Sequence, residues 1–147
     1  MKYLAQFVIG MAVIMSAAGV SAGQDTVNKV AIHVNKNDPK TMNMALNNAQ
    51  NLINYYAKKK QTAKVVIVTY GPGLHMLRKD TSPVQQRIAA MSLANTNLSF
   101  NACGNTHRKM SKQGKQKVTL ISEAQMVPSG VVRLIELQQA GYAYVKP

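Results

Sequence analysis

The sequence predicts one α/β domain, with a parallel β-sheet that carries helices on both of its faces. Two observations lead to this prediction. Short runs of β-branched residues alternate along the 147-residue chain with longer segments whose apolar residues recur at three- and four-residue steps. Residues that favour turns, mainly Gly, Pro, Asn and Asp, separate these segments. Because successive strands joined by a helix usually run parallel, repeated alternation predicts a parallel sheet.

The first strand and helix are predicted from a β-branched run at residues 30–34 and from the pair Asp38 and Pro39. Asp is a favourable N-cap, and Pro is favoured at the first helical position. The basic run 58–60 ends this helix with charge that suits a C-terminus. Its apolar face consists of Met42, Ala45, Leu46, Ala49, Leu52, Ile53 and Tyr56.

A second strand is predicted at residues 64–70, ending at the turn 71–73. Its apolar core is continuous rather than alternating, which is typical of a strand buried on both faces. Ser82 and Pro83 repeat the capping signal of the first helix, and a third strand follows at residues 97–101, with a turn at 102–106. The apolar stripe of this second helix is formed by Val84, Ile88 and Met91.

The last third of the chain is less regular. Residues 112–117 are polar and basic and predict a surface loop or a frayed helical turn, while 118–121 fit either a strand or a linker. We place the fourth strand at 124–127. Gly141 is a favourable end for the final helix, and residues 142–145 predict a closing strand. The final helix is marked by Val131, Leu134, Ile135 and Gln138.

The N-terminus has the features of a secretory signal peptide. Lys2 precedes a mostly apolar run at residues 3–15, and small residues lead to Ala22. An uncleaved membrane anchor is the alternative, but the run is shorter than the roughly 20 residues that span a bilayer. We therefore predict cleavage after Ala22, a mature domain at residues 23–147, a periplasmic or secreted protein, and no stable membrane anchor after cleavage.

Charge and cysteine content exclude several classes of function. The formal net charge is +13, but no aromatic residues are interleaved with the basic clusters for base stacking, so we predict a solvated basic face and no nucleic acid. A single cysteine excludes an internal disulfide and any multi-cysteine metal site. No metal is predicted. No phosphate-binding glycine motif occurs, and no cofactor is predicted.

Four turns are expected at the carboxyl edge of the sheet, where such folds bind ligands. One of them contains Cys103. If Gly104 and Asn105 open a helix, its N-terminus stabilises a thiolate at Cys103, and His107 lies on the same side four residues later. The alternative interpretation is that Cys103 is a small core residue, because free cysteine is often buried. The four turns are residues 35–38, 71–73, 102–106 and 128–130.

Other residues at this edge are weaker candidates. His33 ends an apolar strand, where a histidine is more often packed in the core, and His75 is predicted at the surface. Ser129 fits a helix cap as well as a site residue. The predicted rim of the site consists of His33, Gly71, Gly73, Ser129 and Gly130.

Five motifs in order give the sequence a specific resemblance. They are NMALNNAQNL (43–52), YGPGL (70–74), FNACGNT (100–106), VPSGVV (127–132) and LQQAGYAYVKP (137–147). The sequence resembles the small single-domain branch of the DsrE/DsrF-like family. The resemblance implies a flavodoxin-like three-layer α/β/α sandwich with a five-stranded parallel sheet and assembly as an oligomer. In some members a cysteine after the third strand carries sulfur as a persulfide in a sulfur relay, and Cys103 matches that position.

The resemblance and the residues together predict a periplasmic sulfur carrier or sulfurtransferase-like protein with Cys103 as its persulfide site. Gly104, Asn105 and Thr106 are expected to donate hydrogen bonds to the sulfur, and His107 to tune the thiol. A sulfur donor or acceptor protein is the expected partner. The alternative is a non-catalytic module that binds a small anion at the same edge. The apolar closing strand at 142–145 also favours a homo-oligomer.

Overall fold

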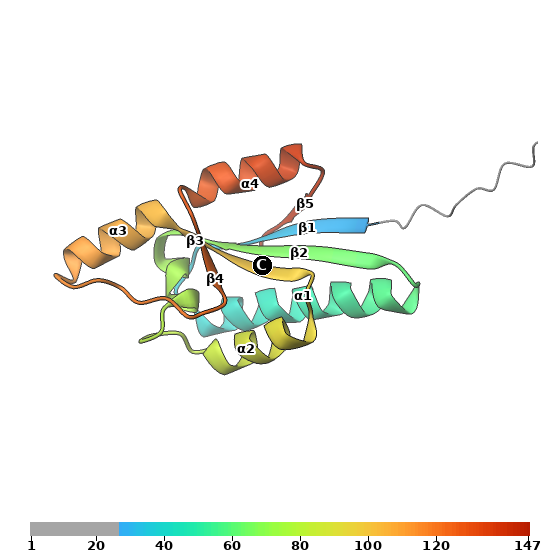
Figure 1. Cartoon of the computed structure of the whole chain (residues 1–147), viewed down its shortest axis with the longest axis horizontal. Helices are drawn as coiled ribbons and strands as arrows, with labels where there is room; N and C mark the ends of the chain where they lie inside the picture. Colours follow the sequence, from blue (N-terminus) through green and yellow to red (C-terminus); the bar gives the residue numbers. More distant parts are fainter. Residues whose placement is uncertain (1–26) are drawn as a thin grey trace, which may run out of the picture.

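The structure, a computed structural model, describes residues 27–147 (Figure 1). The predicted signal peptide at residues 1–22 and the predicted start of the domain at residue 23 lie outside the described residues. Within the described part of the chain, no helix has the length and apolar character needed to cross a membrane.

The sheet has five strands in the order β4-β3-β2-β1-β5, and every neighbouring pair is parallel. The predicted parallel sheet is therefore confirmed. The short strands β4 and β5 form its two edges. The strands are β1 (Val27–Val34), β2 (Thr62–Thr69), β3 (Leu98–Cys103), β4 (Ala124–Val127) and β5 (Ala143–Val145).

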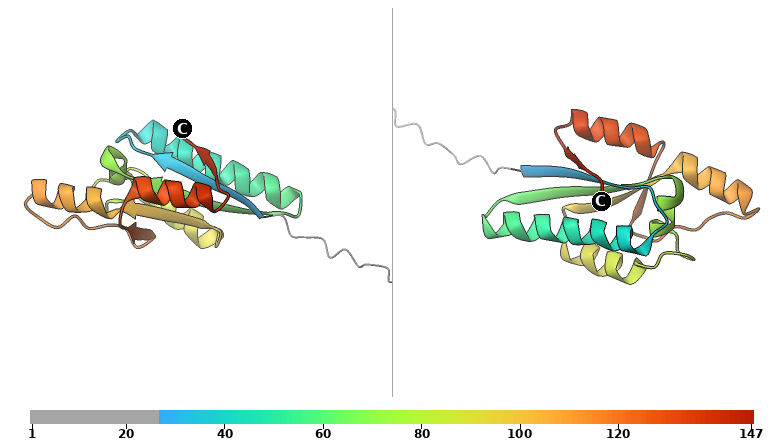
Figure 2. Two further views of the ribbon diagram at one scale, coloured as in Figure 1. Left: turned by 90° about the horizontal axis from the view of Figure 1, so that it is seen from above. Right: turned by 180° about the vertical axis from the view of Figure 1, so that it is seen from behind.

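Helices cover the two faces unequally. Figures 1 and 2 show α1 (Pro39–Lys58) and α2 (Gln85–Ala94) together on one face, and α4 (Gly130–Gln139) alone on the other. The remaining helix, α3 (Gly104–Gln113), extends away from the carboxyl edge of the sheet (Figure 1). We call the two faces the α1/α2 side and the α4 side. This arrangement confirms the three-layer α/β/α architecture.

The beginning of α1 follows from its sequence as predicted. The Asp38 carboxylate accepts hydrogen bonds from the N–H groups of Lys40 and Thr41, and Pro39 occupies the first helical position. These bonds satisfy donors that have no partner within the helix. The buried face of α1 contains Met42, Ala45, Leu46 and Ala49, all predicted.

Two predicted segments differ from the structure. Ser82 is not the N-cap of α2, because α2 begins at Gln85 and its N-cap is Val84. The Ser82 hydroxyl donates to the Met76 carbonyl at 2.6 Å and accepts from the Val84 N–H at 3.4 Å. The predicted turn 102–106 is also wrong. Ala102 and Cys103 pair with β4, so that β3 continues to Cys103 and α3 begins at the next residue.

Two shorter segments are also refined. Residues 71–73 are the first residues of a 3-10 helix, η1 (Gly71–Leu77). The segment 118–121 is not a strand of the sheet; its Leu120 forms an isolated antiparallel bridge with Arg78. Both segments lie near the carboxyl edge, because η1 directly follows β2.

Candidate functional site

Cys103 lies where β3 ends and α3 begins, and it is the N-cap residue of that helix. Its side chain is buried, with 4% of its surface exposed. The sulfur accepts a hydrogen bond from the Thr106 N–H at 3.5 Å, as expected for an N-cap side chain. Gly104 and Asn105 thus open a helix directly after the cysteine, the arrangement on which the predicted thiolate stabilisation depends.

Several donors surround the Cys103 sulfur. Burial acts to raise the pKa of the thiol, but hydrogen bonds from the Thr106 hydroxyl and from the N–H groups of Thr106, Gly130 and Asn105 outweigh it, so that the pKa lies below its ordinary value. Gly130 is the first residue of α4. The N-termini of two helices, α3 and α4, therefore converge on one sulfur, where both favour negative charge.

The Thr106 side chain connects the cysteine to the turn after β2. Its Oγ1 accepts a hydrogen bond from the Gly71 N–H at 2.9 Å, which leaves the hydroxyl hydrogen free to point at the sulfur. Gly71 has φ +52°, a conformation that glycine adopts without strain. Gly71, predicted at the rim of the site, thus holds the group that donates to Cys103.

The predicted glycines allow close backbone approaches. A Cβ on Gly130 would lie 2.9 Å from the Tyr70 Cβ and 3.2 Å from the Cys103 Cβ. At Gly104 it would lie 3.0 Å from the Val127 carbonyl oxygen, and at Gly73 2.2 Å from a backbone oxygen of β1. A side chain at any of these positions would require its neighbours to shift. Gly104 and Gly130 thus allow a close approach of the backbone next to Cys103, and Gly73 allows one next to the end of β1.

The three polar candidates His107, Ser129 and His75 differ in their contacts. His107 Nε2 lies 2.8 Å from the Val118 carbonyl oxygen and therefore carries the donated hydrogen. The imidazole has a partner in the loop after α3, and its predicted effect on the thiol stays a prediction. Ser129 occupies the N-cap position of α4, but its side chain makes no capping bond within the described residues. His75, predicted at the surface, is half-buried and hydrogen-bonded to Thr81.

His33 is part of an aromatic cluster beside the cysteine. Only 3% of its surface is exposed, its Nδ1 lies 2.7 Å from the Tyr144 hydroxyl, and its ring stacks on Tyr70 with 4.5 Å between centroids. Burial, followed by the charge of Lys146, lowers the pKa of His33. Its Nε2 is buried and has no hydrogen-bond partner among the described residues. Tyr70 therefore lies between His33 and Gly130.

A cleft of about 320 Å³ lies next to the cysteine and contains Arg133 and Asn101. Arg133 Nε donates to the buried Asn101 Oδ1 at 3.1 Å, and Arg133 Nη1 lies 3.4 Å from the Glu136 carboxylate. Val127, the strand partner of Cys103, also lines this cleft.

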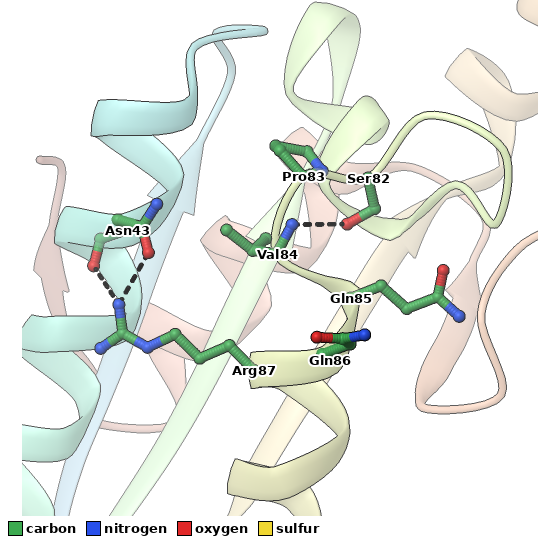
Figure 3. A pocket seen from close by; sticks show the side chains of 7 residues that line it. All are labelled: Asn43, Ser82, Pro83, Val84, Gln85, Gln86 and Arg87. Carbon is green, nitrogen blue, oxygen red and sulfur yellow. Dashed lines mark hydrogen bonds between the residues drawn. The ribbon is translucent and has the colours of Figure 1, made fainter.

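A second cleft, of about 500 Å³, lies between α1 and α2 (Figure 3). Arg87 crosses it and donates to Asn43 Oδ1 at 2.8 Å and to Asn47 Oδ1 at 2.5 Å. These bonds connect the two helices, and the residues that line the cleft include no histidine or cysteine. Because it lacks such side chains, we do not take this cleft as the functional site, although it has the larger volume of the two. Across residues 27–147, no three His, Cys, Asp or Glu side chains are grouped as metal ligands would be.

Comparison with known proteins identifies the family. The model of the DsrE/DsrF-like family matches residues 28–147. The chain belongs to the DsrE/DsrF-like family. Among solved structures it is similar to a protein of unknown function from Methanobacterium thermoautotrophicum, with 25% identity, a TM-score of 0.68, and coverage of 82% of this chain and 99% of that one. A comparison with curated proteins gave no match. Membership in the DsrE/DsrF-like family suggests a sulfur-relay-like role.

Three residues near Cys103 were not among the sequence-based candidates: Tyr70, Asn101 and Arg133. Strand periodicity indicates one of them, because Asn101 lies two residues before Cys103 and so faces the same side of β3. The stacking of Tyr70 on His33 and the reach of Arg133 to Asn101 join residues more than 30 positions apart in sequence. No local pattern indicates contacts of that kind.

Proposed function

We propose that this protein is a sulfur carrier in which Cys103 holds sulfane sulfur as a persulfide. The observation that supports the proposal is the convergence of two helix N-termini and the Thr106 hydroxyl on one thiol with a lowered pKa. A thiolate is the nucleophilic form of cysteine, so this environment increases the reactive fraction near neutral pH. The same donors are suited to the anionic outer sulfur of a persulfide.

The proposed loading step is a simple exchange. The Cys103 thiolate attacks the outer sulfur of a donor persulfide or inorganic polysulfide, and a new sulfur–sulfur bond forms at Cys103. The bond between that outer sulfur and the rest of the donor breaks, and the donor leaves as a thiolate or a shorter polysulfide. Charge and electrons balance without an added oxidant or reductant. Gly104 and Gly130 allow a close backbone approach at which the N–H groups of Asn105 and Gly130 donate to the sulfur.

We also propose that the carrier acts in the periplasm or outside the cell, as a homo-oligomer. The location depends on the predicted signal peptide. The outer face of α4 supports assembly, because Val131, Val132 and Ile135 are each about half exposed. Burial of such apolar surface against a second copy is favourable. A sulfur donor or acceptor protein would approach from the carboxyl edge.

Intact-mass measurement tests the carrier function. We expect the protein treated with inorganic polysulfide and desalted to gain one sulfur atom, and treatment with dithiothreitol to remove it. Cys103→Ser is the control and should gain none. If the native protein gains no sulfur under these conditions, the carrier function is wrong, and the alternative, a small-anion binding module that uses the Arg133 cleft, becomes the better hypothesis.

A further inference from the structure

A helix and loop with only basic charge extend from the proposed persulfide site. We call residues 104–117, which comprise α3 and the loop after it, the basic arm. Gly104 is the only buried residue of α3, and Figure 1 shows the helix extending outward past the end of the sheet. The cations of the arm are Arg108, Lys109, Lys112, Lys115 and Lys117, all of them exposed.

Among the described residues, no cation of the arm forms an ion pair with an acidic side chain of the protein. The sequence contains no Asp or Glu between Asp80 and Glu123. Within residues 27–147, the ion pairs are Arg78 with Asp80 and Arg133 with Glu136, and neither includes a cation of the arm. Like charges held together in this way repel one another and attract an acidic partner.

The basic arm begins directly after Cys103. Cys103 is the N-cap of α3, and a helix of 10 residues is about 15 Å long. A molecule bound along the arm is therefore close to the sulfur. Cys103 is only 4% exposed, so a protein acceptor has to approach in a defined orientation to reach it. Complementary charge beside a site provides such orientation and increases the rate of encounter.

We propose that the basic arm is the docking surface for an acidic partner protein that presents a thiol to Cys103. This inference rests on the proposed carrier function. A membrane surface fits less well, because Met110 is the one large apolar residue of α3 and packs against the core rather than outward. Nucleic acid also fits less well, since the arm contains no Phe, Tyr or Trp for base stacking.

The transfer step balances without a co-reactant. A thiolate of the partner attacks the outer sulfur of the Cys103 persulfide, the bond between the two sulfurs of the persulfide breaks, and Cys103 leaves as a thiolate. The partner becomes the persulfide. The hydrogen bonds that lower the pKa of Cys103 stabilise it as the leaving group.

The experiment measures transfer from the loaded full-length protein to two synthetic peptides, each with one cysteine. One peptide is rich in Glu, and the other has Gln at the same positions. We expect transfer to the acidic peptide to be about tenfold faster at low salt, with the difference decreasing as salt screens the charges. In the variant Lys109→Gln, Lys112→Gln, Lys117→Gln, transfer to the acidic peptide should become about as slow as to the neutral one.

A matched control removes the same charge elsewhere. The control variant carries Lys58→Gln, Lys60→Gln and Lys64→Gln, three exposed lysines at or near the start of β2, at the end of that strand away from the carboxyl edge. It should retain most of the preference for the acidic peptide. If the loaded native protein transfers sulfur equally fast to both peptides, the docking surface is wrong while the carrier function stands. If the protein cannot be loaded, the carrier function itself fails.

Three competitors separate the partner classes. A thiol-free Glu-rich peptide should inhibit transfer more strongly than phosphatidylglycerol vesicles or a short single-stranded DNA at equal total charge. Stronger inhibition by the vesicles or the DNA would overturn the assignment of the arm to an acidic protein.

Discussion

On the α1/α2 side of the sheet, 20 buried apolar residues form one cluster, whereas the cluster on the α4 side contains five. Two of the buried polar residues, His33 and Asn101, belong to the α4 side, because they pair with Val68 on either side of it. Cys103 faces the same side, two residues after Asn101. Successive residues of one strand therefore alternate: one packs in the core of the α1/α2 side, and the next faces the site on the α4 side.

The comparison indicates that most of the stability comes from one face and the chemistry from the other. The larger cluster buries more apolar surface and contributes more to the free energy of unfolding. The thinner α4 side leaves room for polar groups, a cleft and a buried thiol next to two helix N-termini. Substitutions on one side should therefore affect one property and leave the other nearly unchanged.

The largest expected effect is on stability. Leu46 is fully buried in the larger cluster, and Leu46→Ala should lower the free energy of unfolding by about 3 kcal/mol. The pKa of Cys103 should not change, because Leu46 lies across the sheet from the thiol. Urea unfolding and the alkylation rate against pH measure the two quantities. A shifted thiol pKa in the folded variant would mean that the two faces are coupled.

A smaller effect on stability is expected at the site. Thr106→Val removes the hydroxyl that accepts from Gly71 and donates to Cys103, so it should cost about 1 kcal/mol. The pKa of Cys103 should rise, because the thiolate loses a donor while its burial remains. Alkylation near neutral pH should then become slower.

An exposed threonine provides the control for this substitution. Thr96→Val lies in the turn before β3 and should leave both the stability and the alkylation rate near the values of the native protein. If the pKa of Cys103 in Thr106→Val equals that of the native protein, the backbone N–H groups alone account for the environment of the thiol.

The core side of the sheet was the more predictable from sequence. The continuous apolar run in β2 and the cap formed by Asp38 depend on residues close together in the chain. The junction at Cys103 is different, because its strand continues only through pairing with Val127 in β4. Ser82 was misassigned as the cap because α2 begins only at Gln85, with Val84 as its N-cap, and the Ser82 hydroxyl also bonds to the Met76 carbonyl in η1.

Only part of the candidate site could be predicted, because some of its features depend on residues close together in the chain and others on tertiary contacts. Local sequence was sufficient to select Cys103 and the glycines around it. It did not indicate that Tyr70 stacks on His33 or that Arg133 bonds to Asn101. The first contact joins the end of β2 to β1, and the second joins α4 to β3, so both depend on tertiary packing. The α4 side therefore needs the tertiary structure to be described, whereas the α1/α2 side follows largely from periodicity.

The smallest expected effect concerns pH. The pKa of His33 lies below its ordinary value of 6.5 in the folded protein, so the unfolded chain binds a proton at a higher pH than the native one does. Stability should therefore begin to fall as the pH drops through about 6.5 and continue to fall until the folded state is protonated as well. His33→Phe retains an aromatic ring next to Tyr70 and removes this titration.

His75, whose pKa is also lowered by burial, is present in both the native protein and His33→Phe, so its contribution cancels in the comparison. Urea midpoints from about pH 7.5 to about pH 5 should decrease less steeply for His33→Phe than for the native protein. Equal slopes would show that protonation of His33 does not destabilise the fold and that the α4 side tolerates a charge next to its aromatic cluster.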